Sequence, residues 1–558
     1  MTPKRFAFLI ILNLCTGLLA PARRIRAPQA LQAAGDDATV LWLHGDGVSN
    51  VYGASSPRPN PSHSTVAAQL ARRVGHFDAK VRGTTDATAG DVVIGLGVTD
   101  VSKTKATLAR LQPSCFVADD ECSPDVKELA FCAGWTPGAA SLLDKLQKAL
   151  PFTTKASRAR LLAQSELLLA RGSSEDALFA ALFLVHALVR PCAVVASDIN
   201  PSWEKGVLRN LQEFKTMTDC CGPQIAAALS DPKTKSAIDA LNAVDLRDQV
   251  GSYRVIVSNE TPELEEFTLC ILQQNDCFGS DAPILDRPRV PLLREWRGRP
   301  LDEKAARQIL IGHLDHPEAH PDCTRGEDWS WKIVVGANPA YDAFPMQHQI
   351  FYPSGDDRRG EAEEAGGKDP HPPASPSMWY DPVFCVETLE GERIWCKRHY
   401  RVTPRRHWSA TTGAGATPGA WTLTTLDNGM VSEEWWTTVA AADDLSWAVL
   451  HYSGAAKRAG QSYVGALLCS PDGRWPEDCR SGPGLERIRD AFRMCDLELW
   501  ELFGGSFEDS YMWDQNYLQW KEDHPPPLER IGDISITRWR KQEREKALEA
   551  KKVVESKI

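Results

Sequence analysis

AWTLTTLDNGMVSEEWWTTVA, residues 420–440, determines how the C-terminal half of this 558-residue chain folds. Apolar and aromatic residues recur in runs of strand length on both sides of Asn428-Gly429, a dipeptide that favours the tight turn of a two-residue β-hairpin. Further runs of strand length, rich in aromatic and β-branched residues, lie on both sides of this hairpin. Together they make eight expected strands: 329–335, 346–353, 379–387, 393–402, 419–427, 430–440, 445–452 and 461–470.

These strands predict an antiparallel sheet, because turn signals rather than helical crossovers connect them. Glu390-Gly391, Gly454 and Pro471-Asp472-Gly473 mark further turns. Eight such strands can close into a barrel wide enough for one small ligand. A β-sandwich is the competing architecture. The charged, Pro-rich residues 354–378 are expected to form a disordered insertion between the second and third strands.

Helical patterns dominate the other segments. Ser173 and Asp176 form a capping-box-like start to the apolar run 176–189. This run is too short to span a bilayer, so we expect a buried core helix. Near the C-terminus, one helical face is apolar and predicts a helix packed on the barrel wall. That face carries Leu485, Ile488, Phe492 and Cys495.

The chain is too long for one compact core, so we expect several domains. The predicted class is an α+β multidomain protein with a helical N-terminal head, an eight-stranded antiparallel barrel and a C-terminal helix. The expected units are a targeting segment (1–36), a partly helical region of unknown function (37–200), a helical, cysteine-containing head and linker (201–325), the barrel with its flanking helix (326–503) and a charged tail (504–558).

The N-terminus is typical of a targeting sequence. Lys4 and Arg5 precede a short apolar run, as in a signal peptide. An Arg- and Ala-rich stretch without acidic residues follows, up to Asp36, and it has the chemistry of an organelle transit peptide. A two-part plastid address and a plain secretory signal both fit. Either compartment permits disulfides among the 15 cysteines.

The net charge and the composition of one histidine-containing stretch argue against two classes of partner. The formal net charge of −11 offers no electrostatic footprint for a nucleic acid, so no such partner is expected. His313, His316, His320 and Cys323 have a spacing open to zinc. They lie in an acidic, Pro-rich stretch typical of a linker, so no bound metal or prosthetic group is expected.

Two carboxylates are candidates for acid chemistry. Period-two alternation places Glu433 and Trp435 on one strand face, which we expect to point into the barrel because of the tryptophan. A carboxyl among apolar neighbours has a raised pKa and can donate a proton. If the face points outward instead, Glu433 is a solvated charge. Asp342 follows the first strand and is either a turn-former or the second member of a carboxylate pair.

Five stretches within residues 245–503 resemble the violaxanthin de-epoxidases of plants and algae, most closely their related branch. This resemblance implies a lipocalin-type barrel behind a cysteine-rich head, located in a plastid. It also implies reduction of an epoxy-xanthophyll in the thylakoid lumen, with ascorbate as co-substrate. A peripheral contact with the thylakoid membrane and a dimer stay open. The stretches are VSNETPELEEFTLCILQQNDC (257–277), DWSWKIVVGANPAYDAF (328–344), MWYDPVFCVETLEGERIWCKRHYRV (378–402), LDNGMVSEEWWT (426–437) and LSWAVLHYSGAAKRAGQSYVGALL (445–468).

The resemblance also implies roles for individual residues. Asp342 and Glu433 correspond to the family's pair of catalytic aspartates. The residues expected to bind substrate are Gln347, Trp435 and Tyr452, together with Trp331 at the start of the barrel.

The chain departs from the family at several positions. Pro345, Met346, Gln349 and Tyr352 occupy the positions of an Asp, a Cys and two histidines, the histidines being associated with pH-dependent membrane attachment. Residues 228–245 lack the closely spaced cysteines of the family's head. A non-catalytic carotenoid- or lipid-binding lipocalin is therefore an alternative to the enzyme, and an epoxy-carotenoid isomerase is another.

Overall fold

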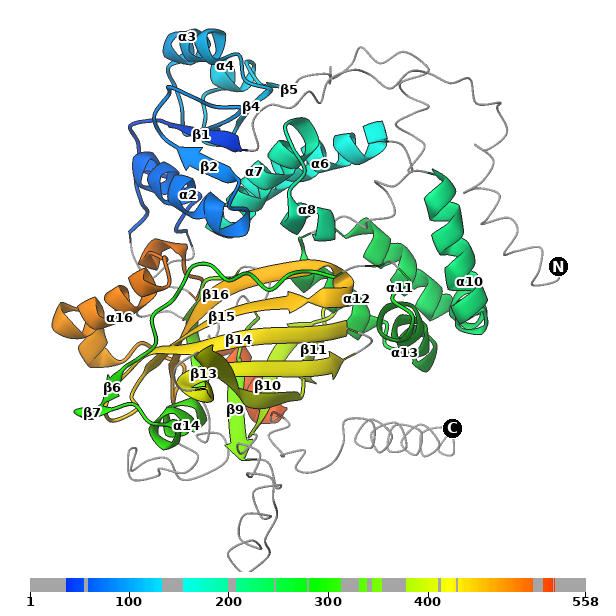
Figure 1. The fold of residues 1–558 in the computed structure, drawn as a ribbon, viewed down its shortest axis with the longest axis vertical. Coiled ribbons are helices and arrows are strands. Elements are labelled where there is room, and N and C mark those ends of the chain that lie inside the picture. Colours follow the sequence, from blue (N-terminus) through cyan, green and yellow to red (C-terminus); the bar gives the residue numbers. More distant parts are fainter. Residues whose placement is uncertain are drawn as a thin grey trace, which may run out of the picture.

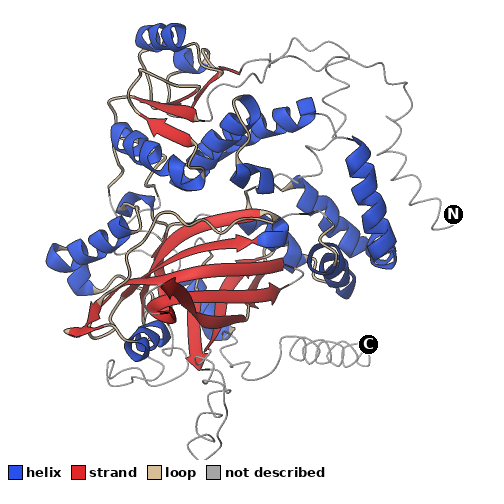
Figure 2. Cartoon of the chain, in the orientation of Figure 1, coloured by secondary structure: helices blue, strands red, loops and turns tan. Residues whose placement is uncertain are grey.

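A computed structural model shows a large β-barrel beside a smaller α/β unit and a group of helices (Figures 1 and 2). The expected targeting segment, the stretch 313–323 and residues 527–558 lie outside the residues that the structure describes. Those residues are 37–54, 59–132, 154–198, 207–244, 247–277, 279, 281–312, 331–338, 344–353, 378–409, 413–427, 430–504, 515–524 and 526.

Eight antiparallel strands form the barrel. The ring closes because β9 pairs with both β8 and β10, which joins the two ends of the sheet. The expected α+β class and the closed eight-stranded barrel are therefore confirmed, and the β-sandwich is excluded. The strands are β8 (Trp331–Gly336), β9 (His348–Pro353), β10 (Met378–Glu387), β12 (Tyr400–Ser409), β13 (Gly413–Asp427), β14 (Met430–Ala441), β15 (Ala448–Ala456) and β16 (Gln461–Ser470).

The hairpin that predicts the barrel is present. β13 and β14 pair in an antiparallel register that ends at Asp427 and Met430, which leaves two residues for the turn. The turn residues themselves lie outside the described part of the chain.

The expected strand 393–402 is wrong in one respect, because it is two strands. β11 (Arg393–Lys397) pairs with the second half of β10, whereas β12 pairs with the beginning of β10. Between them, the backbone N–H of Arg398 donates to the Pro382 carbonyl at 3.1 Å. The chain thus changes its pairing site along β10, and the side chain of Arg398 faces the barrel interior.

The N-terminal α/β unit was not predicted as a sheet. Its strand order is β2-β1-β3-β4-β5, with the first four strands parallel and β5 antiparallel. Parallel strands covered on both faces form continuous apolar runs, so period-two alternation does not reveal them. The elements are β1 (Ala38–His44), α2 (His63–Phe77), β2 (Val81–Thr84), β3 (Val92–Leu96), α3 (Val101–Leu111), β4 (Cys115–Ala118), α4 (Pro124–Lys127) and β5 (Phe131–Cys132).

The apolar run 176–189 is a buried helix, as predicted. It belongs to α7 (Ser174–Leu188), which begins where the Ser173 hydroxyl accepts a hydrogen bond from the Asp176 N–H at 3.1 Å. Every residue from Leu178 to Val185 is fully buried, and the helix packs on the α/β sheet together with α2. No helix within the described ranges is both long enough and apolar enough to cross a membrane.

The other helices before the barrel form the head and the connections around it. One disulfide, Cys221–Cys270, joins two of them. The elements are α6 (Thr154–Ala170), α8 (Ala193–Asp198), α10 (Val207–Ser230), α11 (Pro232–Ala243), α12 (Gln249–Ser258), α13 (Pro262–Thr268), the π-helix η1 (Leu269–Gln274), the two-residue strands β6 (Glu295–Trp296) and β7 (Arg299–Pro300), and α14 (Glu303–Ile311).

The predicted amphipathic helix after the barrel is α16 (Gly482–Met494). Its apolar face is buried against β14 and β15. The short 3-10 helix η7 (Leu499–Glu501) follows and contacts the N-terminal unit. Helix α17 (Gln515–Asp523) then places Trp520 against Trp395 of β11, with a ring-centroid distance of 5.3 Å.

A buried arginine joins three parts of the molecule. One nitrogen of Arg247, just before α12, lies 2.9 Å from a carboxylate oxygen of Glu175 in α7, and another donates to the Ser462 carbonyl of β16 at 3.1 Å. The guanidinium also lies 3.6 Å from the ring centroid of Phe179. Burial raises the pKa of Glu175 against the opposing charge of Arg247, and the net result is a rise from 4.5 to about 7.

Arg247→Met is expected to lower the free energy of unfolding by about 3 kcal/mol at pH 8, because it leaves the ionised Glu175 buried without its partner. Since the folded-state pKa of Glu175 lies above its unfolded value, its contribution to stability is lost as the pH rises from about 4.5 through 7. At pH 5 the carboxyl is protonated and the loss should be smaller. Urea unfolding of the full chain at both pH values measures this, with the exposed Arg299→Met as control. Equal losses at the two pH values would contradict the assignment.

Candidate functional site

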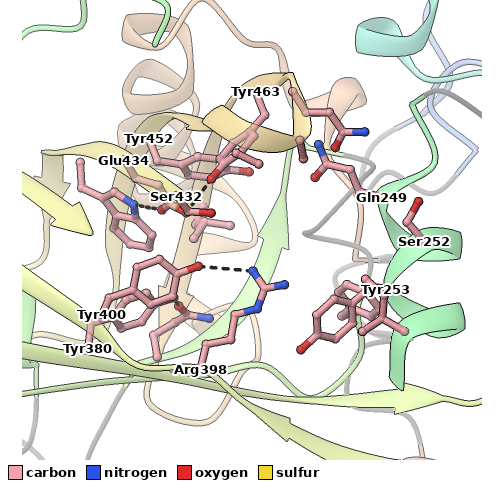
Figure 3. Close-up of a pocket in the computed structure, with 18 of the residues that line it drawn as sticks. Gln249, Ser252, Tyr253, Tyr380, Arg398, Tyr400, Ser432, Glu434, Tyr452 and Tyr463 are labelled. Carbon is pink, nitrogen blue, oxygen red and sulfur yellow. Dashed lines mark hydrogen bonds between the residues drawn. The ribbon is translucent and has the colours of Figure 1, made fainter. Parts of the chain in front are cut away.

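A cavity of about 290 Å³ lies inside the barrel, under helices α11 and α12 of the head (Figure 3). Its walls combine apolar and aromatic side chains with a few polar ones. The residues that line it are Leu241, Gln249, Ser252, Tyr253, Ile256, Ile333, Phe344, Gln349, Tyr380, Arg398, Tyr400, Ser432, Glu434, Trp436, Tyr452, Ala456, Ala459, Gln461, Tyr463 and Leu467.

One carboxyl, Glu434 of β14, reaches the cavity. Its Oε1 accepts a hydrogen bond from the Tyr463 hydroxyl at 2.8 Å, and its Oε2 accepts one from the Trp436 indole at 2.6 Å. Burial raises the pKa of Glu434, while these two hydrogen bonds and the charge of Arg398 oppose the rise. Glu434 therefore takes up a proton at a higher pH than an exposed glutamate and can act as an acid.

Two glycines make room for this arrangement. Gly454 of β15 pairs with Glu434 on one side and with Tyr463 on the other. A Cβ atom at Gly454 would lie 2.4 Å from the Tyr463 ring and 2.8 Å from Cγ of Glu434. Tyr463 can thus cross β15 to reach Glu434 because Gly454 has no side chain. Gly465 does the same for Tyr452 on the neighbouring pair of strands.

Aromatic rings form a continuous wall around the cavity. Phe351 and Tyr380 are stacked with centroids 4.4 Å apart. Tyr380 is 5.4 Å from Trp436, which is 5.8 Å from Tyr452, and Tyr452 is 6.3 Å from Tyr463. Such a wall suits a flat apolar ligand, because ring faces offer large contact areas.

Arg398 supplies a positive charge on the opposite side of the cavity (Figure 3). Its guanidinium lies 4.6 Å from the ring centroid of Tyr253 and 3.4 Å from the Tyr400 hydroxyl. The cavity therefore holds an acidic and a basic group, each held by aromatic neighbours.

Helix α12 covers the cavity with one face. Gln249, Ser252, Tyr253 and Ile256 lie three or four residues apart, so their side chains share that face. Tyr253 also packs against Phe344 at a centroid distance of 5.7 Å. The head therefore contributes directly to the site.

The expected inward face of β14 is wrong. Ser432, Glu434 and Trp436 line the cavity, whereas Glu433 is 28% exposed and lies 2.8 Å from Lys457. Trp435 is on the same outer face and donates to Glu433 at 3.3 Å. The sequence has Glu-Glu followed by Trp-Trp, so both phases of the alternation place one Glu and one Trp inside. Periodicity could not distinguish them.

Of the other residues predicted for the site, only some lie in the cavity wall. Tyr452 lines the cavity. Gln347 is buried, but its amide donates to the Phe344 carbonyl at 2.9 Å, and Gln349, two residues later, lines the cavity instead. The Trp331 indole donates to the Ile309 carbonyl of α14 at 2.9 Å and does not line the cavity. Asp342 lies outside the described residues.

Several site residues were missed by the sequence analysis, chiefly Glu434, Arg398 and Tyr463. The strand pattern that pointed to Glu433 applies equally to its neighbour Glu434. The two differ only in which face of β14 points into the barrel. The signal for Tyr463 was the glycine opposite it on β15. Arg398 carried no signal, because it lies where one expected strand is two. No group of His, Cys, Asp or Glu suited to a metal ion occurs among the described residues.

No protein-family model and no curated protein matches the chain. Among solved structures, the chain is similar to lobster apocrustacyanin A1 at 9% identity, with 35% of this chain and 87% of that chain covered and a TM-score of 0.19. It is similar to the siderocalin Ex-FABP at 11% identity, with 32% of this chain and 94% of that chain covered and a TM-score of 0.19. For apocrustacyanin C1 the identity is 9%, the coverage 35% and 87%, and the TM-score 0.20.

Gly454→Ala should displace Tyr463 from Glu434, because the added methyl group would occupy the space of the ring. Overpacking of this kind costs about 1–3 kcal/mol. Thermal unfolding of the full chain measures the loss, and Gly222→Ala is the control because nothing lies within 4 Å of its added Cβ. A stability equal to that of the wild type would show that the Tyr463 ring does not cross β15.

Proposed function

We propose that the barrel binds a small apolar molecule that carries a polar oxygen group. The observation that carries this proposal is the aromatic cavity inside the barrel with one buried acid, Glu434, in its wall. Small-molecule sites are concave and mostly apolar, with a few placed polar groups that orient the ligand. The aromatic wall would hold the apolar body of the ligand, and Glu434 would hydrogen-bond its oxygen.

The cavity volume limits the ligand. About 290 Å³ is at the lower end of small-molecule pockets, which span roughly 300–1,000 Å³. One ring end of a long molecule, or a smaller ligand as a whole, suits this volume. The resemblance to violaxanthin de-epoxidases makes an oxygenated carotenoid our first candidate, with its ring inside and its polyene leaving the barrel.

A second candidate function is acid catalysis on an epoxide. The raised pKa of Glu434 and its place in the cavity favour it. Glu434 would give its proton to the epoxide oxygen as one C–O bond breaks, which leaves a hydroxyl group and a carbocation. Ascorbate would then supply two electrons and two protons, the oxygen would leave as water and an alkene would form. Dehydroascorbate is the oxidised product, and Glu434 regains its proton.

An isomerase would use the same first step without a reductant. The Glu434 carboxylate would take a proton from a carbon next to the carbocation, and the hydroxyl group would stay on the product. Ascorbate as co-substrate and a location in the plastid belong to the reductive candidate.

Binding is tested by adding detergent-solubilised violaxanthin to the purified full chain and following tryptophan fluorescence and pigment co-elution. The chain offers matched controls in neighbouring residues of the same type. Trp436→Ala, inside the cavity, should weaken binding at least tenfold, whereas Trp435→Ala, outside it, should change binding less than twofold. No saturable binding, or equal effects of the two variants, would refute the proposed site.

Catalysis is tested with the same pigment at pH 5, with and without ascorbate, by chromatography of the products. Glu434→Gln should abolish conversion, because the amide has no proton to donate, while Glu433→Gln should retain it. Conversion that needs ascorbate indicates reduction, and conversion without it indicates isomerisation. If violaxanthin binds but stays unchanged in all reactions, the enzyme candidate is wrong and the binding function stands.

A further inference from the structure

A second, open cleft of about 580 Å³ lies away from the barrel interior, between α2 and the end of α16. These two helices are neighbours in Figure 1 although more than 400 residues separate them in the chain. The segment that precedes β6 completes the cleft. Its lining residues are Arg72, His76, Arg287, Pro288, Arg289, Arg493, Met494 and Asp496.

Positive charge is concentrated in this cleft. Four of its eight lining residues are arginines, and its one carboxylate is Asp496. Both oxygens of Asp496 are already engaged, Oδ1 by Arg72 and Oδ2 by His76 at 3.3 Å. Arg493 lies 3.2 Å from Glu498 and 3.9 Å from Asp490.

Arg287 and Arg289 differ from Arg72 and Arg493 in their ion pairing. Both are exposed, and neither forms an ion pair with any residue that the structure describes. The ion pair between α2 and the residues that follow α16 is made by Arg72 with Asp496. Although the chain has a net charge of −11, Arg287 and Arg289 give this cleft positive charge that no ion pair among the described residues balances.

His76 lies beside these arginines, and their positive charge affects its pKa. Burial, together with the charges of Arg73, Arg72 and Arg287, lowers the pKa of His76 from 6.5 to about 4. His76 is therefore neutral near pH 7, and the positive charge of the cleft is that of its arginines.

We infer that this cleft binds a small polyanion that carries phosphate groups. The planar guanidinium of arginine matches phosphate oxygens in a bidentate way and keeps its charge at every physiological pH. Arg287 and Arg289 would bind the phosphates, while Arg72 and Arg493, whose charges nearby carboxylates balance, would border the ligand on either side. The ligand would contact both the N-terminal unit and the helix that packs on the barrel, so its binding would stabilise their contact.

The test is calorimetric titration of the full chain with sodium tripolyphosphate at pH 7.5 and 150 mM salt. Saturable binding at one site is expected. Arg287→Gln/Arg289→Gln should weaken it at least tenfold, while Arg299→Gln/Arg401→Gln, a pair of exposed arginines elsewhere, should change it less than twofold. Tripolyphosphate should also raise the unfolding temperature of the wild type but not that of the cleft variant.

Three outcomes would overturn the inference. The first is no saturable heat up to millimolar tripolyphosphate. The second is an equal loss in the control variant, which would mean unspecific attraction to surface charge. The third is citrate binding as tightly as tripolyphosphate, which would remove the assignment to phosphate. Circular dichroism of each variant establishes that it is folded before titration.

Discussion

The pairing of β9 with both of its neighbours constrains the whole barrel. Without it the sheet would be open and its edge strands would present unpaired backbone groups. Because the ring is closed, each strand has one row of side chains inside the barrel and one row outside it. The side chains in the cavity therefore come from strands spread over more than 100 residues, and each is placed by the phase of its own strand. Trp331 anchors the first of these strands through its hydrogen bond to α14.

The same short segment of the head has two structural roles. Arg247 binds Glu175 and the Ser462 carbonyl, and two residues later α12 begins and covers the cavity. The cover of the cavity is therefore continuous with the contact between the N-terminal unit and the barrel. A change in that contact would therefore move the start of α12, which lies two residues from Arg247 and lines the cavity. This gives the N-terminal unit a structural connection to the barrel, although no motif in its own sequence suggests an activity.

The sequence was sufficient for most strands of the barrel and for two helices, because these depend on local signals. Turn dipeptides, alternation and the apolar face of residues 485–495 each require only neighbouring residues. The parallel sheet was missed, since its strands are covered on both faces and show no alternation. The face of β14 was also missed, because Glu433-Glu434 and Trp435-Trp436 have the same composition in either phase. The barrel could thus be predicted and the groups inside it could not, because tertiary contacts such as Gly454 with Tyr463 select the phase.

The paired residues of β14 have a consequence for how this site tolerates change. A deletion or insertion of one residue in the turn before β14 would shift the strand by one position, about 3.3 Å. In most strands such a shift exchanges the interior row for the exterior row and replaces apolar residues with polar ones. Here it would bring Glu433 and Trp435 inside in place of Glu434 and Trp436. The cavity would keep an acid and an indole, so length variation in this turn would alter the position of the groups while preserving their kind.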